Sequence, residues 1–159
     1  MNKVKTLRVI LIFFIILWTC LIFLFSSQDG GESSGFSRKF VEFFIKDPEL
    51  VNKIEPYVRK LAHFSEYGLG GVLFISLFST YEWTDRRKII TSILLGVWYA
   101  IMDEIHQLMV PGRSGALKDV YIDSLGITTG VIGMLIVIKI FELIKNKREN
   151  KLESKAEVK

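Results

Sequence analysis

The chain contains four long apolar runs separated by polar segments. The runs cover residues 9–25, 61–81, 89–109 and 120–138. Each is close to the roughly 20 apolar residues that an α-helix needs to cross the hydrocarbon core of a bilayer. The pattern therefore predicts an all-α, polytopic membrane protein with four transmembrane helices.

The polar segment after the first run predicts a further helix that does not cross the membrane. Its apolar positions recur at helical spacing, opposite charged residues, and they are phenylalanines: Phe36, Phe40, Phe43 and Phe44. This pattern is typical of an amphipathic helix that lies in the membrane interface. We expect Pro48 to end this helix. We expect Pro56 to begin the second transmembrane helix, because proline is tolerated in the first helical turn.

The first apolar run follows Lys3, Lys5 and Arg8, as in a secretory signal peptide. Its apolar stretch is longer than the usual 7–15 residues of such a peptide, and it lacks a small-residue cleavage site. We therefore expect it to be the first transmembrane helix.

Basic residues predict how the helices are oriented. The N-terminus, the link 82–88 and the chain from Lys139 onward are rich in Lys and Arg, which favours a cytoplasmic position for all three. The stretch 26–60 also holds six Lys or Arg, a contrary signal, although it has as many Asp and Glu. We expect both termini in the cytoplasm.

This orientation defines the remaining parts of the chain. The segments 26–56 and 110–119 are expected to face outward. Residues 1–144 are expected to form a single membrane domain, and residues 145–159 a charged cytoplasmic tail.

Composition narrows the classes of function. Half of the residues are hydrophobic and the mean hydropathy is +0.34, as expected for a membrane protein. The net charge is +4, but the basic residues stand in short, dispersed clusters, which does not favour a nucleic-acid partner. Cys20 is the only cysteine, so the chain has neither an intrachain disulfide nor a CxxC metal site.

Ionisable and polar residues gather near one end of three apolar runs. They are Arg59 and Lys60 just before the second run and His63, Glu66 and Tyr67 within it, Asp103, Glu104, His106 and Gln107 in the third run, and Asp119 just before the fourth run and Asp123 within it. Spacings of three or four residues place most of them along one side of each helix. Because such groups are costly in a bilayer unless they face one another or water, we expect a shared polar pocket that opens outward. Arg59, Lys60 or Arg113 would supply its positive charge.

Several chemistries suit this constellation. The residues can form a structural hydrogen-bond network between helices. The His-x-x-Glu of the second run and the Glu-x-His of the third can also hold a divalent metal, or act as general acids and bases. Lys60 and Arg113 would then bind a phosphate or carboxylate. Ser65 and Ser114 stand near these motifs, but neither is in a nucleophile-elbow setting.

The fourth run also carries Gly126, Gly130 and Gly133, at intervals that are typical of closely packed helices. We expect these glycines to have a structural role.

Two sequence blocks resemble the signature blocks of the VanZ-like family. They are RKLAHFSEYGLG at residues 59–70 and WYAIMDEIHQLMVPGRSGALKDVYIDSLG at residues 98–126. The string Ser26-Ser27-Gln28 is also similar to the family. The resemblance extends over about residues 25–137.

This resemblance implies a multi-span membrane protein of bacteria. The founding member is linked to resistance to the glycopeptide teicoplanin, with little effect on vancomycin. The positions typical of the family are Lys60, His63, Glu66, Tyr67, Asp103, Glu104, His106, Gln107, Arg113, Asp119 and Asp123. Some similar proteins carry an acyltransferase label, but this sequence has no soluble transferase fold to support it.

Three functions fit the sequence. The protein can be a binding protein whose pocket holds a membrane lipid, a lipid-linked cell-wall precursor or a lipoglycopeptide. It can be a hydrolase or transferase acting on a lipid-linked headgroup, with Glu66 or Glu104 as base, His63 or His106 as acid, and Arg113 on a phosphate. A transporter is disfavoured, because four spans are few and the ionisable groups gather at one face.

Overall fold

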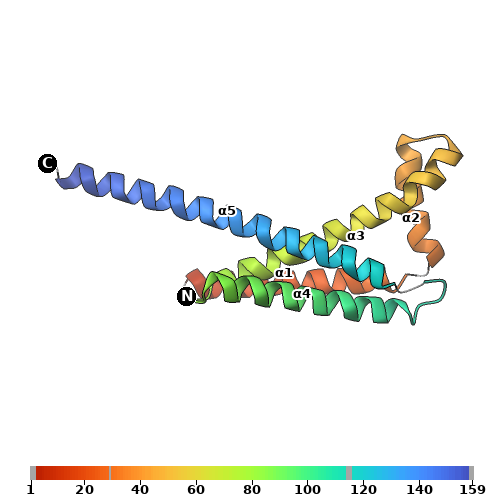
Figure 1. The fold of residues 1–159 in the computed structure, drawn as a ribbon, viewed down its shortest axis with the longest axis horizontal. Coiled ribbons are helices and arrows are strands. Elements are labelled where there is room, and N and C mark those ends of the chain that lie inside the picture. The colour runs from red at the N-terminus through yellow and green to blue at the C-terminus, as the bar shows by residue number, and fades with distance from the viewer. Residues whose placement is uncertain (1–2, 29, 114–115, 158–159) are drawn as a thin grey trace.

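The computed structural model describes residues 3–28, 30–113 and 116–157, which form five α-helices and no strand (Figure 1). The helices are α1 (Lys3–Ser26), α2 (Gly30–Phe44), α3 (Pro48–Ser79), α4 (Asp85–Gln107) and α5 (Leu117–Glu157). Helices α1, α3, α4 and α5 are long and apolar enough to cross a membrane. The predicted all-α membrane protein with four spans is therefore confirmed.

The apolar side chains of these four helices mostly point away from the protein. At most 28% of the most apolar stretch of each helix is buried inside the molecule, and side chains such as Phe13 and Leu94 are more than half exposed. A soluble protein rarely exposes such large apolar surfaces. In lipid they are favourable, and the helices satisfy their own backbone hydrogen bonds.

Helix α3 begins earlier than the sequence predicts. Asp47 caps it by accepting a hydrogen bond of 2.9 Å from the backbone N–H of Glu49, and Pro48 opens its first turn. Pro56 lies inside the helix, so the expectation that it starts the second span was wrong. Val51 in the added turns is buried, α2 packs on α3, and Arg38 of α2 donates a hydrogen bond of 2.9 Å to Asn52; these contacts stabilise the added turns. The helix is about 48 Å long, more than a bilayer core requires.

Helix α2 confirms the amphipathic helix predicted between the first two spans. It ends at Phe44, before Pro48. Its four phenylalanines are 57–78% exposed, whereas Val41 is buried. The helix lies across the end of the bundle, roughly perpendicular to α1 and α4 (Figure 1).

Trp18 joins α1 to α3 at the centre of the core. Its ring packs edge-on against Tyr67 and Phe74, and its Nε1 donates a hydrogen bond of 2.9 Å to the carbonyl of Glu66. The Tyr99 hydroxyl donates to the carbonyl of Thr19 at 2.8 Å, which ties α4 to α1. These contacts fix how α1, α3 and α4 are rotated about their axes relative to one another.

Helices α3 and α5 cross each other (Figure 1), and their backbones are in contact at the crossing point. A Cβ added at Gly126 would overlap the carbonyl of Phe64, and one added at Gly130 would overlap the carbonyl of Gly68. Gly133 has no neighbour within 4 Å of an added Cβ among the described residues. The prediction of close packing is therefore right for two of these glycines and wrong for Gly133.

The three basic segments lie at one end of the molecule. Arg8 donates hydrogen bonds to the side chain and the carbonyl of Thr80, at 3.0 and 2.6 Å. Lys139 forms an ion pair of 2.9 Å with Asp85. Both termini lie on this side of the bundle (Figure 1). Helix α5 continues without a break past residue 144, so the charged tail begins as an extension of this helix.

Candidate functional site

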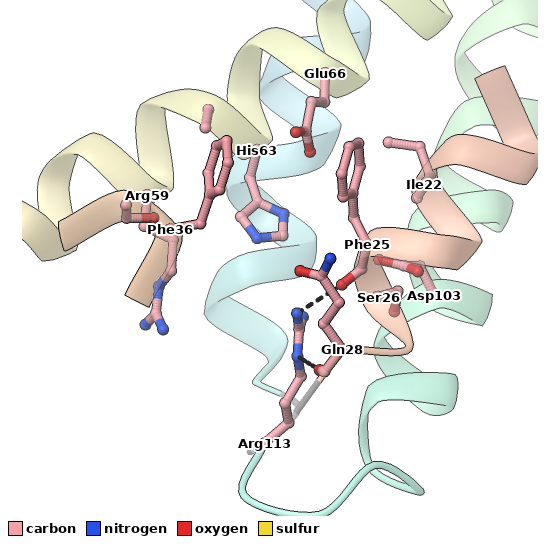
Figure 2. A pocket seen from close by; sticks show the side chains of 12 residues that line it. Ile22, Phe25, Ser26, Gln28, Phe36, Arg59, His63, Glu66, Asp103 and Arg113 are labelled. Atoms are coloured by element: carbon pink, nitrogen blue, oxygen red, sulfur yellow. Dashed lines mark hydrogen bonds between the residues drawn. The ribbon is translucent and has the colours of Figure 1, made fainter. Parts of the chain in front are cut away.

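A polar cavity of about 200 Å³ lies at the end of the bundle opposite the termini. Its walls are formed by helices α1, α2 and α3, by Gln28 in the α1–α2 link, by one residue of α4, and by Arg113 in the α4–α5 loop. Its lining residues are Ile22, Phe25, Ser26, Gln28, Phe36, Ser37, Arg59, Ala62, His63, Glu66, Asp103 and Arg113 (Figure 2).

Helix α3 supplies one polar wall. Arg59, His63 and Glu66 follow one another by four and three residues, so they form a row along one side of the helix. Within the described residues, the side chains of Arg59 and Glu66 make no hydrogen bond or ion pair. The wall therefore presents a guanidinium, an imidazole and a carboxylate to the cavity.

Helix α4 supplies only Asp103 to the cavity. This side chain is 6% exposed and accepts a hydrogen bond of 2.9 Å from Nε2 of Gln107. Glu104 turns away and accepts a hydrogen bond of 2.9 Å from the backbone N–H of Ala116, next to the first turn of α5. This bond satisfies a backbone donor that the start of a helix leaves unpaired.

His106 lies on another side of α4. Its Nε2 is 3.1 Å from the Ser27 hydroxyl, and its ring stacks on Phe23 with centroids 4.6 Å apart. The residue thus contacts the end of α1 and borders a separate, mostly apolar groove.

Arg113 joins the α4–α5 loop to the end of α1. Its Nε donates to the carbonyl of Gln28 at 2.9 Å, and its Nη2 donates to the carbonyl of Phe25 at 2.8 Å (Figure 2). Carbonyls at the end of a helix lack intrahelical partners and carry partial negative charge, so a guanidinium stabilises them. Arg113 closes the outer edge of the cavity.

Asp123 of α5 lies behind the cavity wall. Its side chain is fully buried, and neither carboxyl oxygen accepts a hydrogen bond from a described residue. Nδ1 of His63 lies 3.9 Å from its Oδ1. His63 therefore stands between the cavity and this buried carboxyl group.

The structure brings together some of the residues singled out in the sequence and separates others. His63, Glu66, Asp103 and Arg113 line the cavity, with Asp123 behind His63. Lys60, Tyr67, Glu104, His106, Gln107 and Asp119 do not line it. Arg59, rather than Lys60, supplies positive charge from α3, because adjacent residues point about 100° apart around a helix.

Sequence reasoning missed several lining residues. Ser26 and Gln28 belong to a string that resembles the family, but no role was assigned to them. Phe36 reaches the cavity from α2, although its pattern indicated only an apolar helix face. Only the folding of the first loop against α3 reveals this contribution.

The geometry gives little support to a metal site or to a serine nucleophile. In the described part of the chain, no three His, Cys, Asp or Glu side chains converge on a point that could hold a metal ion. Ser65 is exposed and donates its hydroxyl to the carbonyl of Leu61 at 2.8 Å. Ser114 lies outside the described residues.

Replacing Arg113 by methionine is expected to lower the free energy of unfolding by about 2–4 kcal/mol. The change removes two charge-assisted hydrogen bonds, to the carbonyls of Phe25 and Gln28, and leaves the Phe25 carbonyl with only the longer bond of 3.4 Å from the Gln28 N–H among the described residues. Thermal unfolding of the purified protein in detergent measures the loss. Lys118→Met, a nearby change at an exposed lysine, is the matched control. Equal stability of the two variants would show that Arg113 does not hold the loop.

Together these features define a multi-pass α-helical membrane protein with a polar cavity at one end of its bundle. The family model VanZ/LLP1 matches residues 11–141, which is most of the chain. The protein therefore belongs to the VanZ/LLP1 family, as the two sequence blocks indicated. No curated protein and no solved structure matches the chain.

Proposed function

We propose that this protein binds the headgroup of a lipid or a lipid-linked envelope component in its polar cavity, at the outer face of the bacterial cell membrane. Through this binding it contributes to tolerance of teicoplanin-type glycopeptides. One observation carries the proposal: residues of both charge signs line one cavity at the end of four lipid-exposed helices. Such residues are rare near a bilayer unless a polar ligand pathway or pocket requires them.

The size of the cavity limits its ligand. Pockets for drug-sized molecules usually measure about 300–1,000 Å³, and this cavity measures about 200 Å³. It has room for a headgroup but not for a whole glycopeptide. A lipid or a lipid-linked precursor is therefore the favoured partner, with its acyl chains remaining in the membrane.

The distribution of basic residues supports an outward-facing cavity. Arg86, Arg87 and Lys88 open α4 at the same end of the molecule as both termini. Short basic segments next to transmembrane helices favour the cytoplasm. The cavity then faces outward, and the phenylalanine face of α2 enters the outer membrane interface.

Cysteine labelling tests this orientation in intact cells. In a Cys20→Ser background, Lys53→Cys at the exposed start of α3 is expected to react with a membrane-impermeant maleimide. Glu149→Cys in the extension of α5 is expected to react only after the cells are permeabilised. The reverse pattern would place the cavity in the cytoplasm and contradict the proposal.

Filling the cavity tests the binding role. Ala62 and the neighbouring Leu61 are both exposed, but only Ala62 lines the cavity. We expect the wild type and Leu61→Trp to retain a lipid when native mass spectrometry is applied to purified protein, and Ala62→Trp to lose it. The tryptophan at position 62 occupies the space of the headgroup without altering charge. Equal lipid retention by the two tryptophan variants would contradict binding in this cavity.

The same cavity supports a second candidate, a hydrolase or transferase that acts on the lipid-linked headgroup. The observation in its favour is His63, which faces the cavity with a buried carboxyl group behind it and Glu66 beside it. Glu104 is engaged with Ala116, so Glu66 and His63 are the acid–base pair for this alternative. Mass spectrometry of the retained lipid distinguishes the two: a lipid that is altered on incubation favours the enzyme, and an unaltered lipid favours the binding protein.

A further inference from the structure

The two ends of the cavity carry opposite charge. Arg59 lies one turn before His63 on α3, and Arg113 lies in the loop beyond the end of α4, so both belong to the outer end. Glu66 lies seven residues further along α3 than Arg59, and Asp103 lies within α4. The inner end of the cavity is therefore acidic (Figure 2).

No Lys or Arg of the described residues forms a direct ion pair with the inner carboxylates. Glu66 makes no side-chain hydrogen bond or ion pair there, and Asp103 accepts a hydrogen bond from the neutral amide of Gln107 but forms no ion pair. Behind them, His63 is the one basic side chain within 4 Å of the Asp123 carboxyl among the described residues. Carboxylates at the edge of a bilayer require a positive counter-charge or a proton.

Ser26 provides a second, independent sign of a ligand. It is 3% exposed, it lines the cavity, and its hydroxyl oxygen has no hydrogen-bond partner among the described residues. Figure 2 draws it on the same side of the cavity as Asp103. Because buried hydroxyl groups are normally hydrogen-bonded, this one indicates a missing partner.

We propose that the cavity binds a headgroup that carries both a phosphate and a primary ammonium group. The inference rests on the proposed headgroup-binding function and names its ligand class. The phosphate lies at the outer end, between Arg59 and Arg113. The ammonium lies toward Glu66 and Asp103, with the Ser26 hydroxyl on the Asp103 side of the cavity.

The number of hydrogen bonds favours a primary ammonium over a quaternary one. A primary ammonium has three N–H donors, and the inner end offers three acceptor groups: the two carboxylates and the Ser26 hydroxyl. A trimethylammonium group has no N–H donor and would leave all three without a hydrogen bond.

The length of the headgroup also fits. Arg59 and Glu66 are about 10 Å apart along the axis of α3. A phosphate and an ammonium joined by two carbons, with a hydrogen bond of about 3 Å at each end, span a similar distance.

Binding of four probes to the purified full-length protein tests the proposal. Three are short-chain lipids with identical acyl chains and phosphoethanolamine, phosphocholine or phosphoglycerol headgroups, and the fourth is free phosphoethanolamine. We expect the phosphoethanolamine lipid to bind at least about tenfold more tightly than the other two lipids. Weaker binding of free phosphoethanolamine would identify a membrane lipid as the source of the headgroup, and equal binding would identify a soluble ligand.

Two variants locate the subsites. Glu66→Gln is expected to weaken binding of the phosphoethanolamine lipid about tenfold and to leave the other two lipids unchanged. Arg59→Gln is expected to weaken the binding of all three lipids by the same factor, because each of them carries a phosphate. Glu82→Gln, at an exposed position in the α3–α4 turn, is the matched control and is expected to bind like the wild type.

The outcomes separate this inference from the proposed function. Equal binding of phosphoethanolamine and phosphocholine lipids by the wild type would overturn the ammonium site, whether or not the variants fold. The proposed headgroup binding would still be supported if Arg59→Gln weakened the binding of the phosphoethanolamine lipid and of the phosphocholine lipid. If no lipid binds, or if Arg59→Gln and Ala62→Trp bind as the wild type does, the proposed function itself fails.

Discussion

Replacing Gly130 by leucine is expected to separate α3 from α5 and to lower the free energy of unfolding by roughly 3 kcal/mol or more. An added Cβ at this position would overlap the backbone carbonyl of Gly68. A backbone carbonyl inside a helix cannot rotate away as a flexible side chain can, so the whole helix must shift. His63 belongs to α3 and Asp123 to α5, so that shift would also move these two side chains apart.

Gly133→Leu is the matched control for this change. Gly133 lies one turn further along α5 and is exposed, with no described neighbour within 4 Å of an added Cβ. Thermal unfolding in detergent is expected to give a large drop in melting temperature for Gly130→Leu and little change for Gly133→Leu. Similar melting temperatures for the two variants would show that α3 and α5 do not meet as described.

The transmembrane helices could be predicted from the sequence because lipid leaves few alternatives. Long apolar runs in a bilayer must form helices that satisfy their own backbone, so 61–81 and 89–109 correspond closely to parts of α3 and α4. The start of α3 could not be predicted in the same way. Pro56 lies inside α3, and the packing of α2 on the first turns of this helix, where Val51 is buried, is a tertiary contact that the sequence pattern does not contain.

The sides of the helices that meet at the site were only partly predictable. Spacing places His63 and Glu66 on one side of α3, and both line the cavity. Spacing cannot determine how α4 is rotated relative to α3, which depends on distant contacts such as that of Tyr99 with α1. Glu104 and His106 consequently face the α5 start and the α1 end rather than the cavity.

The glycines show the same limit. The spacing of Gly126 and Gly130 indicated close packing, and both touch the backbone of α3. Gly133 fits the same sequence pattern, but α3 and α5 diverge beyond their crossing (Figure 1). The angle between two helices, which a linear pattern does not contain, decides how long a glycine row stays in contact.

Loss of the central cavity residues is expected to abolish the biological effect of the protein. His63→Ala removes the imidazole between the cavity and Asp123, and Glu66→Gln removes one inner charge while keeping the shape of the side chain. In both variants the four transmembrane helices keep their apolar surfaces, so insertion into the membrane is expected to continue. Glu82→Gln, which changes an exposed carboxylate outside the cavity in the same way, is expected to retain full function.

The most direct test of the cavity as the functional site is the susceptibility of a sensitive Gram-positive host to teicoplanin and vancomycin. The host expresses the wild type, His63→Ala, Glu66→Gln or Glu82→Gln at matched membrane levels. We expect the wild type and Glu82→Gln to raise tolerance of teicoplanin with little change for vancomycin, and the two cavity variants to leave the host as sensitive as without the protein. Equal protection by all four proteins, or by none of them, would contradict this account.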